Sequence, residues 1–282
     1  MIGPKQDQEV HGSGTAIQAA GNVQIEQNYH GLQVAEVREL TEIFLDRQLP
    51  ALRAEAVAAM RENTEAFISE IVARLAQSEK VTQESFAKPD AQVCFNEALK
   101  GSAEKGGQID LGMLADMVIG RLESDNDPLI KLIYEDSIKI LPRLTGPQIE
   151  YLAYLTWMRH IKHGAVDHVD WLESIAQKVL SITRLGADIS KTNKEYMASV
   201  GVITINLVTD ADNSFTSLRT NYSFLPEDKE QLAEQAPALY KLLDCWAKSE
   251  SSLYHLNGTG KLIGLIALQK VLGKLNLAIW IN

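Results

Sequence analysis

The histidines and acidic residues between positions 160 and 170 have side chains and spacings that could support metal binding or catalysis. His160, His163 and His168 lie close together, with Asp167 and Asp170 beside the last of them. Imidazole nitrogens and carboxylate oxygens bind zinc when at least three of them converge. His160 and His163 would share one helix face at this spacing, but we expect a helix end before His168. Histidines also suit the carbonyl end of a helix, so we expect a solvated helix end and no metal.

A glycine-containing turn near the C-terminus has the composition of a phosphate loop but not its spacing. The run Asn257-Gly258-Thr259-Gly260-Lys261 is followed by Leu262 instead of Ser or Thr, and its glycines do not fit the Gly-x-x-x-x-Gly-Lys pattern. A tight turn that opens a helix explains the same residues. We therefore expect no bound nucleotide and no other cofactor.

Nucleophilic catalysis has no signature in this chain. The sequence contains no Gly-x-Ser-x-Gly, and Cys94 and Cys245 lie outside any recognisable catalytic pattern. Cys94 stands between Val93 and Phe95, so packing as a small apolar group is expected. The sequence favours a protein that is not an enzyme, although a hydrolase with an unrecognised site stays open.

Basic residues near the C-terminus indicate an alternative function, which is nucleic-acid binding. The expected order of strand, helix over about 259–272 and final strand is also that of a winged helix. Lys261, Gln269, Lys270 and Lys274 would then contact nucleic acid. Base reading usually needs Arg, Asn or Gln, and this helix offers only Gln269 beside its lysines. The plain interpretation is a capping unit with solvated lysines, so a nucleic-acid-binding regulator is the second choice.

Charge and composition restrict the partners. The formal net charge is −10, which argues against broad binding to nucleic-acid phosphates or anionic lipids. The start of the chain lacks the basic and apolar regions of a signal peptide, and no apolar run reaches the ~18 residues of a membrane span. The apolar helix over 259–272 could bind a membrane surface, but a core helix is favoured. We expect a reducing cytoplasm with both thiols, Cys94 and Cys245, buried and free.

The elements that would position these residues are mainly helical. Apolar residues at helical spacing, with helix starts such as Asp127-Pro128, predict nine helices, over 34–48, 51–77, 89–104, 110–123, 128–141, 147–162, 166–185, 227–248 with an interruption at Pro237, and 259–272. Short strands are expected at 200–208, 253–256 and 275–281, and connections at 78–90 and 209–225. The fold class is a mainly α multi-helix bundle, with an extended β-like N-terminal arm and a small C-terminal α+β unit.

This pattern divides the chain into three parts. They are an arm over 1–31, a helical domain over 32–185 and an α+β unit over 186–282. The core should contain the apolar residues that face inward at helical spacing, among them Val57, Phe67, Ile71, Leu114, Leu152, Leu155, Ile175 and Leu265.

The N-terminal arm is rich in Gly, Gln and Asn and has no helical periodicity. Two short runs, 15–19 and 22–26, have β-like character, and the second alternates apolar with polar side chains. A lone pair of such strands is marginal in water, so pairing with the same segment of other chains would complete it. The expected self-association residues are Ile17, Gln18, Asn22, Val23, Gln24 and Ile25. A disordered tail is the alternative.

Three stretches together resemble an uncharacterised family of bacterial proteins. They are 31–40 (GLQVAEVREL), 141–152 (LPRLTGPQIEYL) and 256–264 (LNGTGKLIG) with the terminal Ile279-Trp280-Ile281. The third is also similar to the closing Leu-Thr-x-x-Gly turn of the abortive-infection alpha family, with Asn257 in place of Thr.

The resemblance implies a role in bacterial conflict, such as defence against phage, and supplies no catalytic residues. The predicted function is therefore a non-enzymatic defence protein that acts by self-assembly and protein contacts. Its expected partners are further copies of itself and a phage or host protein. Nucleic acid and membrane are not expected partners.

Overall fold

The computed structural model describes residues 49–78, 80–124, 127–164, 166–206 and 214–275. The predicted arm over 1–31 and the predicted helix over 34–48 lie outside these ranges. So does the final strand, apart from its first residue, Leu275.

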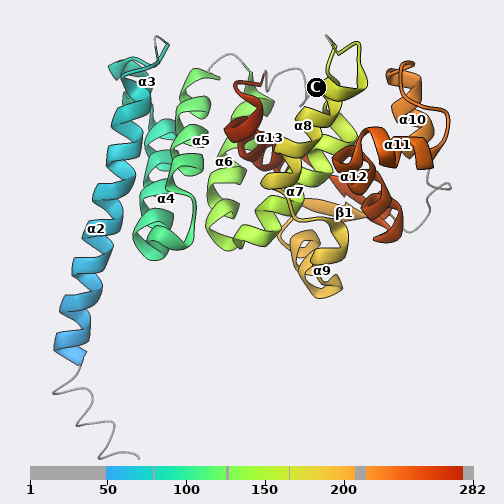
Figure 1. The fold of residues 1–282 in the computed structure, drawn as a ribbon. Helices are drawn as coiled ribbons and strands as arrows, with labels where there is room; N and C mark the ends of the chain where they lie inside the picture. The colour runs from blue at the N-terminus through green and yellow to red at the C-terminus, as the bar shows by residue number, and fades with distance from the viewer. Residues whose placement is uncertain (1–48, 79, 125–126, 165, 207–213, 276–282) are drawn as a thin grey trace, which may run out of the picture. The chain divides into compact units, whose positions relative to one another are not determined.

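Among the described residues, helices and one small sheet make up the fold, so the predicted mainly α class is confirmed (Figure 1). The helices are α2 (Leu49–Leu75), α3 (Gln83–Ala87), α4 (Pro89–Lys105), α5 (Leu111–Glu123), α6 (Pro128–Ile140), α7 (Gly146–His160), α8 (Val169–Ser181), α9 (Lys191–Ser199), α10 (Ser214–Asn221), α11 (Lys229–Gln235), α12 (Pro237–Lys248) and α13 (Gly258–Leu272). The strands β1 (Ile203–Ile205) and β2 (Tyr254–Leu256) pair antiparallel, with Ile203 opposite Leu256.

Local sequence signals start these helices as expected. The Asp127 carboxylate accepts hydrogen bonds from the first N–H groups of α6 at 3.0 and 3.1 Å, with Pro128 as its first residue. The Gln148 side chain accepts from the Thr145 N–H at 2.9 Å, as in a capping box. Pro237 separates α11 from α12. These signals depend only on neighbouring residues, which is why the sequence places the helices well.

The chain divides after Ala54, and residues 55–282 form one compact unit. Of the first unit, the structure describes only the start of α2. In the second unit, α13 lies against α7, α6, α8 and α5, and Leu262–Leu268 are all buried. Helix α13 comes from the predicted C-terminal unit, so that segment shares the core of the earlier helices. None of the described helices is long and apolar enough to cross a membrane.

A glycine sets the close approach of α13 to α7. A Cβ on Gly264 would meet the Thr156 hydroxyl and would lie 2.6 Å from the Leu152 carbonyl oxygen. Only a residue without a side chain therefore fits at this crossing. The contact also fixes which residues of the two helices lie side by side.

Three short helices lie where the sequence analysis expects none. Helix α10 falls in the stretch 209–225, which we expected to be loop, and α3 falls in the expected connection at 78–90. No element was predicted for the residues of α9. Helix α10 packs on the core only through the partly buried Phe215 and Leu218, and α9 buries only Lys194 and Met197, so neither shows an apolar stripe over several turns.

The predicted core is confirmed for most of its members. Those that are fully buried are Phe67, Ile71, Leu114, Leu152, Leu155 and Leu265. Ile175 is partly buried and packs against the core. The prediction is wrong for Val57, whose side chain is 56% exposed. Every residue of α2 from Glu55 to Glu62 is exposed, and burial along the helix begins only at Asn63.

Candidate functional site

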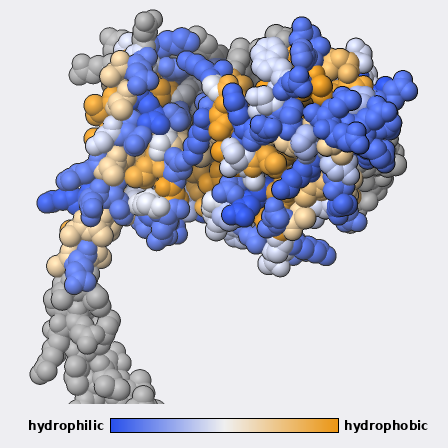
Figure 2. Space-filling model, in the orientation of Figure 1, coloured by the Kyte–Doolittle hydropathy of each residue, from blue (hydrophilic) through white to orange (hydrophobic). Residues whose placement is uncertain are grey.

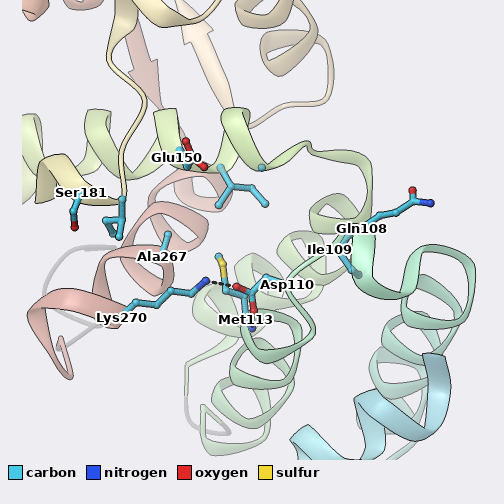
Figure 3. A pocket seen from close by; sticks show the side chains of 11 residues that line it. Gln108, Ile109, Asp110, Met113, Glu150, Ser181, Ala267 and Lys270 are labelled. Atoms are coloured by element: carbon cyan, nitrogen blue, oxygen red, sulfur yellow. Dashed lines mark hydrogen bonds and ion pairs between the residues drawn. The ribbon is translucent and has the colours of Figure 1, made fainter. Parts of the chain in front are cut away.

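One cavity of about 340 Å³ opens between the starts of α5 and α7 and the ends of α8 and α13 (Figure 3). Its walls are apolar where Met113, Ile149 and Ala267 line it, and polar at Asp110 and Lys270. The volume lies in the range of small-molecule sites. The remaining lining residues are Gln108, Ile109, Gly146, Glu150, Ser181 and Ile182.

The charged groups of this cavity are already paired within the chain. Lys270 reaches across to form an ion pair with Asp110, as Figure 3 shows. Burial acts to raise the pKa of Asp110, but the hydrogen bonds from Lys270 and from the Met113 N–H lower it overall. On the opposite wall Glu150 pairs with Arg184 at 2.8 Å. The described lining thus offers a mainly apolar surface and no unpaired acid or base for catalysis.

The three histidines singled out in the sequence do not converge. Helix α7 ends at His160, so the expectation that His163 shares its face is wrong. His163 lies in the following loop, where its backbone N–H donates to the Tyr222 hydroxyl at 2.7 Å. His168 lies beside Asp170, 3.7 Å from its carboxylate, and is exposed. Within the described ranges, no group of three His, Cys, Asp or Glu side chains is placed to hold a metal ion.

The turn at Asn257 opens helix α13 as predicted. The Asn257 side chain accepts a hydrogen bond from the Gly260 N–H at 2.9 Å, and α13 begins at Gly258. Both cysteines are free. Cys94 is buried as expected, and burial raises the pKa of its thiol to about 12. Cys245 packs against the core but is only half-buried, so the expectation of a buried thiol is wrong for this residue.

The four candidate nucleic-acid contacts do not form one exposed row. Lys270 pairs with Asp110, and the Gln269 side chain donates to the Leu275 carbonyl at 3.3 Å. Lys274 is exposed beyond the end of α13, whereas Lys261 is half-buried in its first turn. The middle of α13 is buried, so this helix does not present a face to a groove. Contact with nucleic acid stays a prediction.

His160 instead belongs to a group of basic side chains that have no acid among them. Burial, followed by the charges of Lys261, Arg159 and His255, lowers the pKa of His160 to about 4. Burial and the charge of Arg159 likewise lower the pKa of His255. We call Arg159, His160, His255 and Lys261 the cationic cluster. No pattern in the sequence could have joined them, since they come from α7, β2 and α13.

The exposed half of α2 is a second candidate surface. Met60 is 46% exposed and Val57 more so, although both continue the apolar stripe that Phe67 and Ile71 bury further along the helix. In Figure 2, pale orange residues alternate with blue ones along this half. Packing of α2 begins at Asn63, whose side chain donates to the Ala103 carbonyl at 3.1 Å. We call Glu55–Glu62 the α2 surface.

Comparison with known proteins gives a family and no function. No curated protein and no solved structure matches the chain. A family model matches residues 31–226, which is more than half of the sequence, and it carries no link to the abortive-infection alpha family. The chain therefore belongs to this family, which is uncharacterised.

Proposed function

We propose that this protein acts without catalysis, by assembling with copies of itself and contacting other proteins, and that it does so in bacterial defence. The observation that carries the proposal is the exposed α2 surface. The defence role has its support in the sequence resemblance alone. A phage or host protein is the further partner that this role implies.

The α2 surface is a helix segment whose residues are all exposed among the described elements. Most helix stability in proteins comes from packing of an apolar face. Burial of a Val or Met side chain contributes about 1.5–3 kcal/mol. Val57 is 56% exposed and Met60 is 46% exposed, so each gains only part of this stabilisation from the described residues. A partner that covers them would supply the rest.

We propose a second copy of the chain as the partner. In an antiparallel pair of α2 helices, Val57 of each chain would lie against Met60 of the other, because both residues continue the same apolar stripe. Such a two-fold interface is self-complementary, which is the commonest form of protein dimer.

The predicted arm gives a second route to the same assembly. Pairing of Ile17, Val23 and Ile25 with the same residues of other chains would link pairs of chains into larger assemblies. The chain places the arm and the segment 34–48 directly before α2. Both routes lead to homo-oligomers, and a protein that acts through contacts needs no catalytic residues.

Substitution of Val57 and Met60 together by Glu tests the proposal. Charges at a contact between copies would be buried without partners, so the mass from light scattering should fall. The matched control is Leu129→Glu, an apolar residue of α6 that is 54% exposed. It should leave the mass unchanged. Equal masses for the double variant and the full-length wild type would contradict the proposal, provided that both are helical by circular dichroism.

A further inference from the structure

The cationic cluster is brought together by the crossing of α7 and α13. Gly264 lies against Thr156, so Lys261, one turn earlier on α13, lies near His160, one turn later on α7. His255 comes from β2, which packs against α7 and directly precedes α13. Two distant parts of the sequence, α7 on one side and β2 with α13 on the other, thus place four basic side chains in one region.

Arg159 is held in place by neutral groups. Its Nη2 donates to the Ser252 carbonyl at 2.7 Å, and its guanidinium lies 5.1 Å from the centre of the Trp246 ring. Its Nε is buried and has no acceptor. Among the described residues, no carboxylate pairs with Arg159. Donors of this planar group therefore remain for an acceptor that the described part of the chain does not supply.

Other partly buried arginines of this protein are neutralised. Arg121, which is almost fully buried, pairs with Asp90 at 2.6 Å and with Glu135 at 2.8 Å. Arg74 pairs with Asp116 and Glu70. Arg159 differs from both of these arginines, although acidic residues outnumber basic ones in this chain, whose net charge is −10. An unpaired cation that is half-buried costs free energy unless an anion joins it.

The charges around His160 also indicate a site without acidic residues. Every charged group that acts on His160 is basic, and together with burial these groups keep its imidazole neutral at pH 7. Arg159 and Lys261 then carry the charge of the cluster. An anion that lies beside them would be attracted by both charges.

We propose that the cationic cluster binds the phosphoryl group of a small molecule, with Arg159 and Lys261 as the charged ligands and His160 and His255 as hydrogen-bonding partners. A planar guanidinium matches the oxygens of a phosphoryl group in a bidentate manner, and lysine adds a point charge. Four side chains suffice for one such group. The net charge of −10 opposes a polyanion such as a nucleic-acid backbone.

Titration of the full-length protein with inorganic phosphate tests this site. Calorimetry gives the affinity, and NMR of the imidazole protons follows His160. Bound phosphate should raise the pKa of His160, since an anion beside it favours the protonated form. Lys261→Gln and Arg159→Lys should each weaken binding by roughly tenfold, which corresponds to about 1.4 kcal/mol. The control Lys248→Gln removes an exposed lysine that pairs with Asp244, and should bind as the wild type does.

The outcomes separate the possible ligands. Glycerol phosphate that binds more tightly than inorganic phosphate identifies a phosphate ester as the ligand, and equal or weaker binding identifies the free anion. Absence of any response at His160, or equal affinity in the wild type and Lys261→Gln with helical content preserved, overturns the site. A short oligonucleotide that displaces phosphate at lower concentration overturns its assignment to small molecules.

Discussion

Met60 and Phe67 lie two helical turns apart on one face of α2, yet only Phe67 is buried. Phe67 meets Phe95 of α4, with 6.3 Å between the ring centres, whereas Met60 is 46% exposed. The sequence pattern is continuous across both residues, but the described packing begins only at Asn63. The second half of the stripe therefore packs in the core, and we propose that its first half packs on another chain.

Glu173 of α8 should stabilise the start of α12. Its buried carboxylate accepts hydrogen bonds from the N–H groups of Ala238 and Leu239 at 3.0 and 3.1 Å. Glu173→Ala leaves these N–H groups without a partner, and should lower the free energy of unfolding by ~1–3 kcal/mol in urea. Glu195→Ala, at an exposed glutamate of α9, should change it by less than about 0.5 kcal/mol. Equal losses in the two variants would show that the cap contributes little.

Gly264→Ala tests the crossing of α13 and α7. The added methyl group would lie 2.6 Å from the Leu152 carbonyl oxygen, so the two helices must separate. Overpacking of this kind costs ~1–3 kcal/mol, which thermal unfolding would reveal as a lower Tm. Gly107→Ala is the control, because nothing lies within 4 Å of a Cβ at that position. A Gly264→Ala protein with the wild-type Tm would mean that the helices adjust freely.

The titration of His160 makes the stability depend on pH. Burial and the neighbouring cations lower its folded-state pKa to about 4, whereas an unfolded histidine titrates near ~6.5. Between these values the unfolded chain binds more protons, so the free energy of unfolding should fall as the pH falls. His160→Gln removes this contribution and should show a shallower loss in urea unfolding between pH 6.5 and 4. Profiles of equal slope would contradict the low pKa.

The helices could be predicted from the sequence where local signals mark them. Asp127 with Pro128 and Gln148 with Thr145 start α6 and α7 as expected, because capping involves only neighbouring residues. Helix α10 could not be found in this way, since only Phe215 and Leu218 pack against the core and the helix is too short to repeat that pattern. The predicted arm lies outside the described residues, and its role stays a prediction.

The candidate sites were much harder to predict. The stripe of α2 identified Val57 as an inward residue, because periodicity shows which side of a helix is apolar but not what covers it. The cationic cluster joins Arg159 with His255 and Lys261 only after α7, β2 and α13 have packed. Asp110 and Lys270 also come together only in the folded chain, because they lie far apart in the sequence.

The mass of the full chain in solution, compared with that of a chain lacking residues 1–31, tests the central claim most directly. Light scattering of the full chain should give a multiple of 31.2 kDa that grows with concentration. Deletion of the arm should lower this mass toward that of an α2-paired dimer, with helical circular dichroism preserved. A full chain of 31.2 kDa at every concentration, or a mass that the deletion leaves unchanged, would contradict self-assembly through the arm.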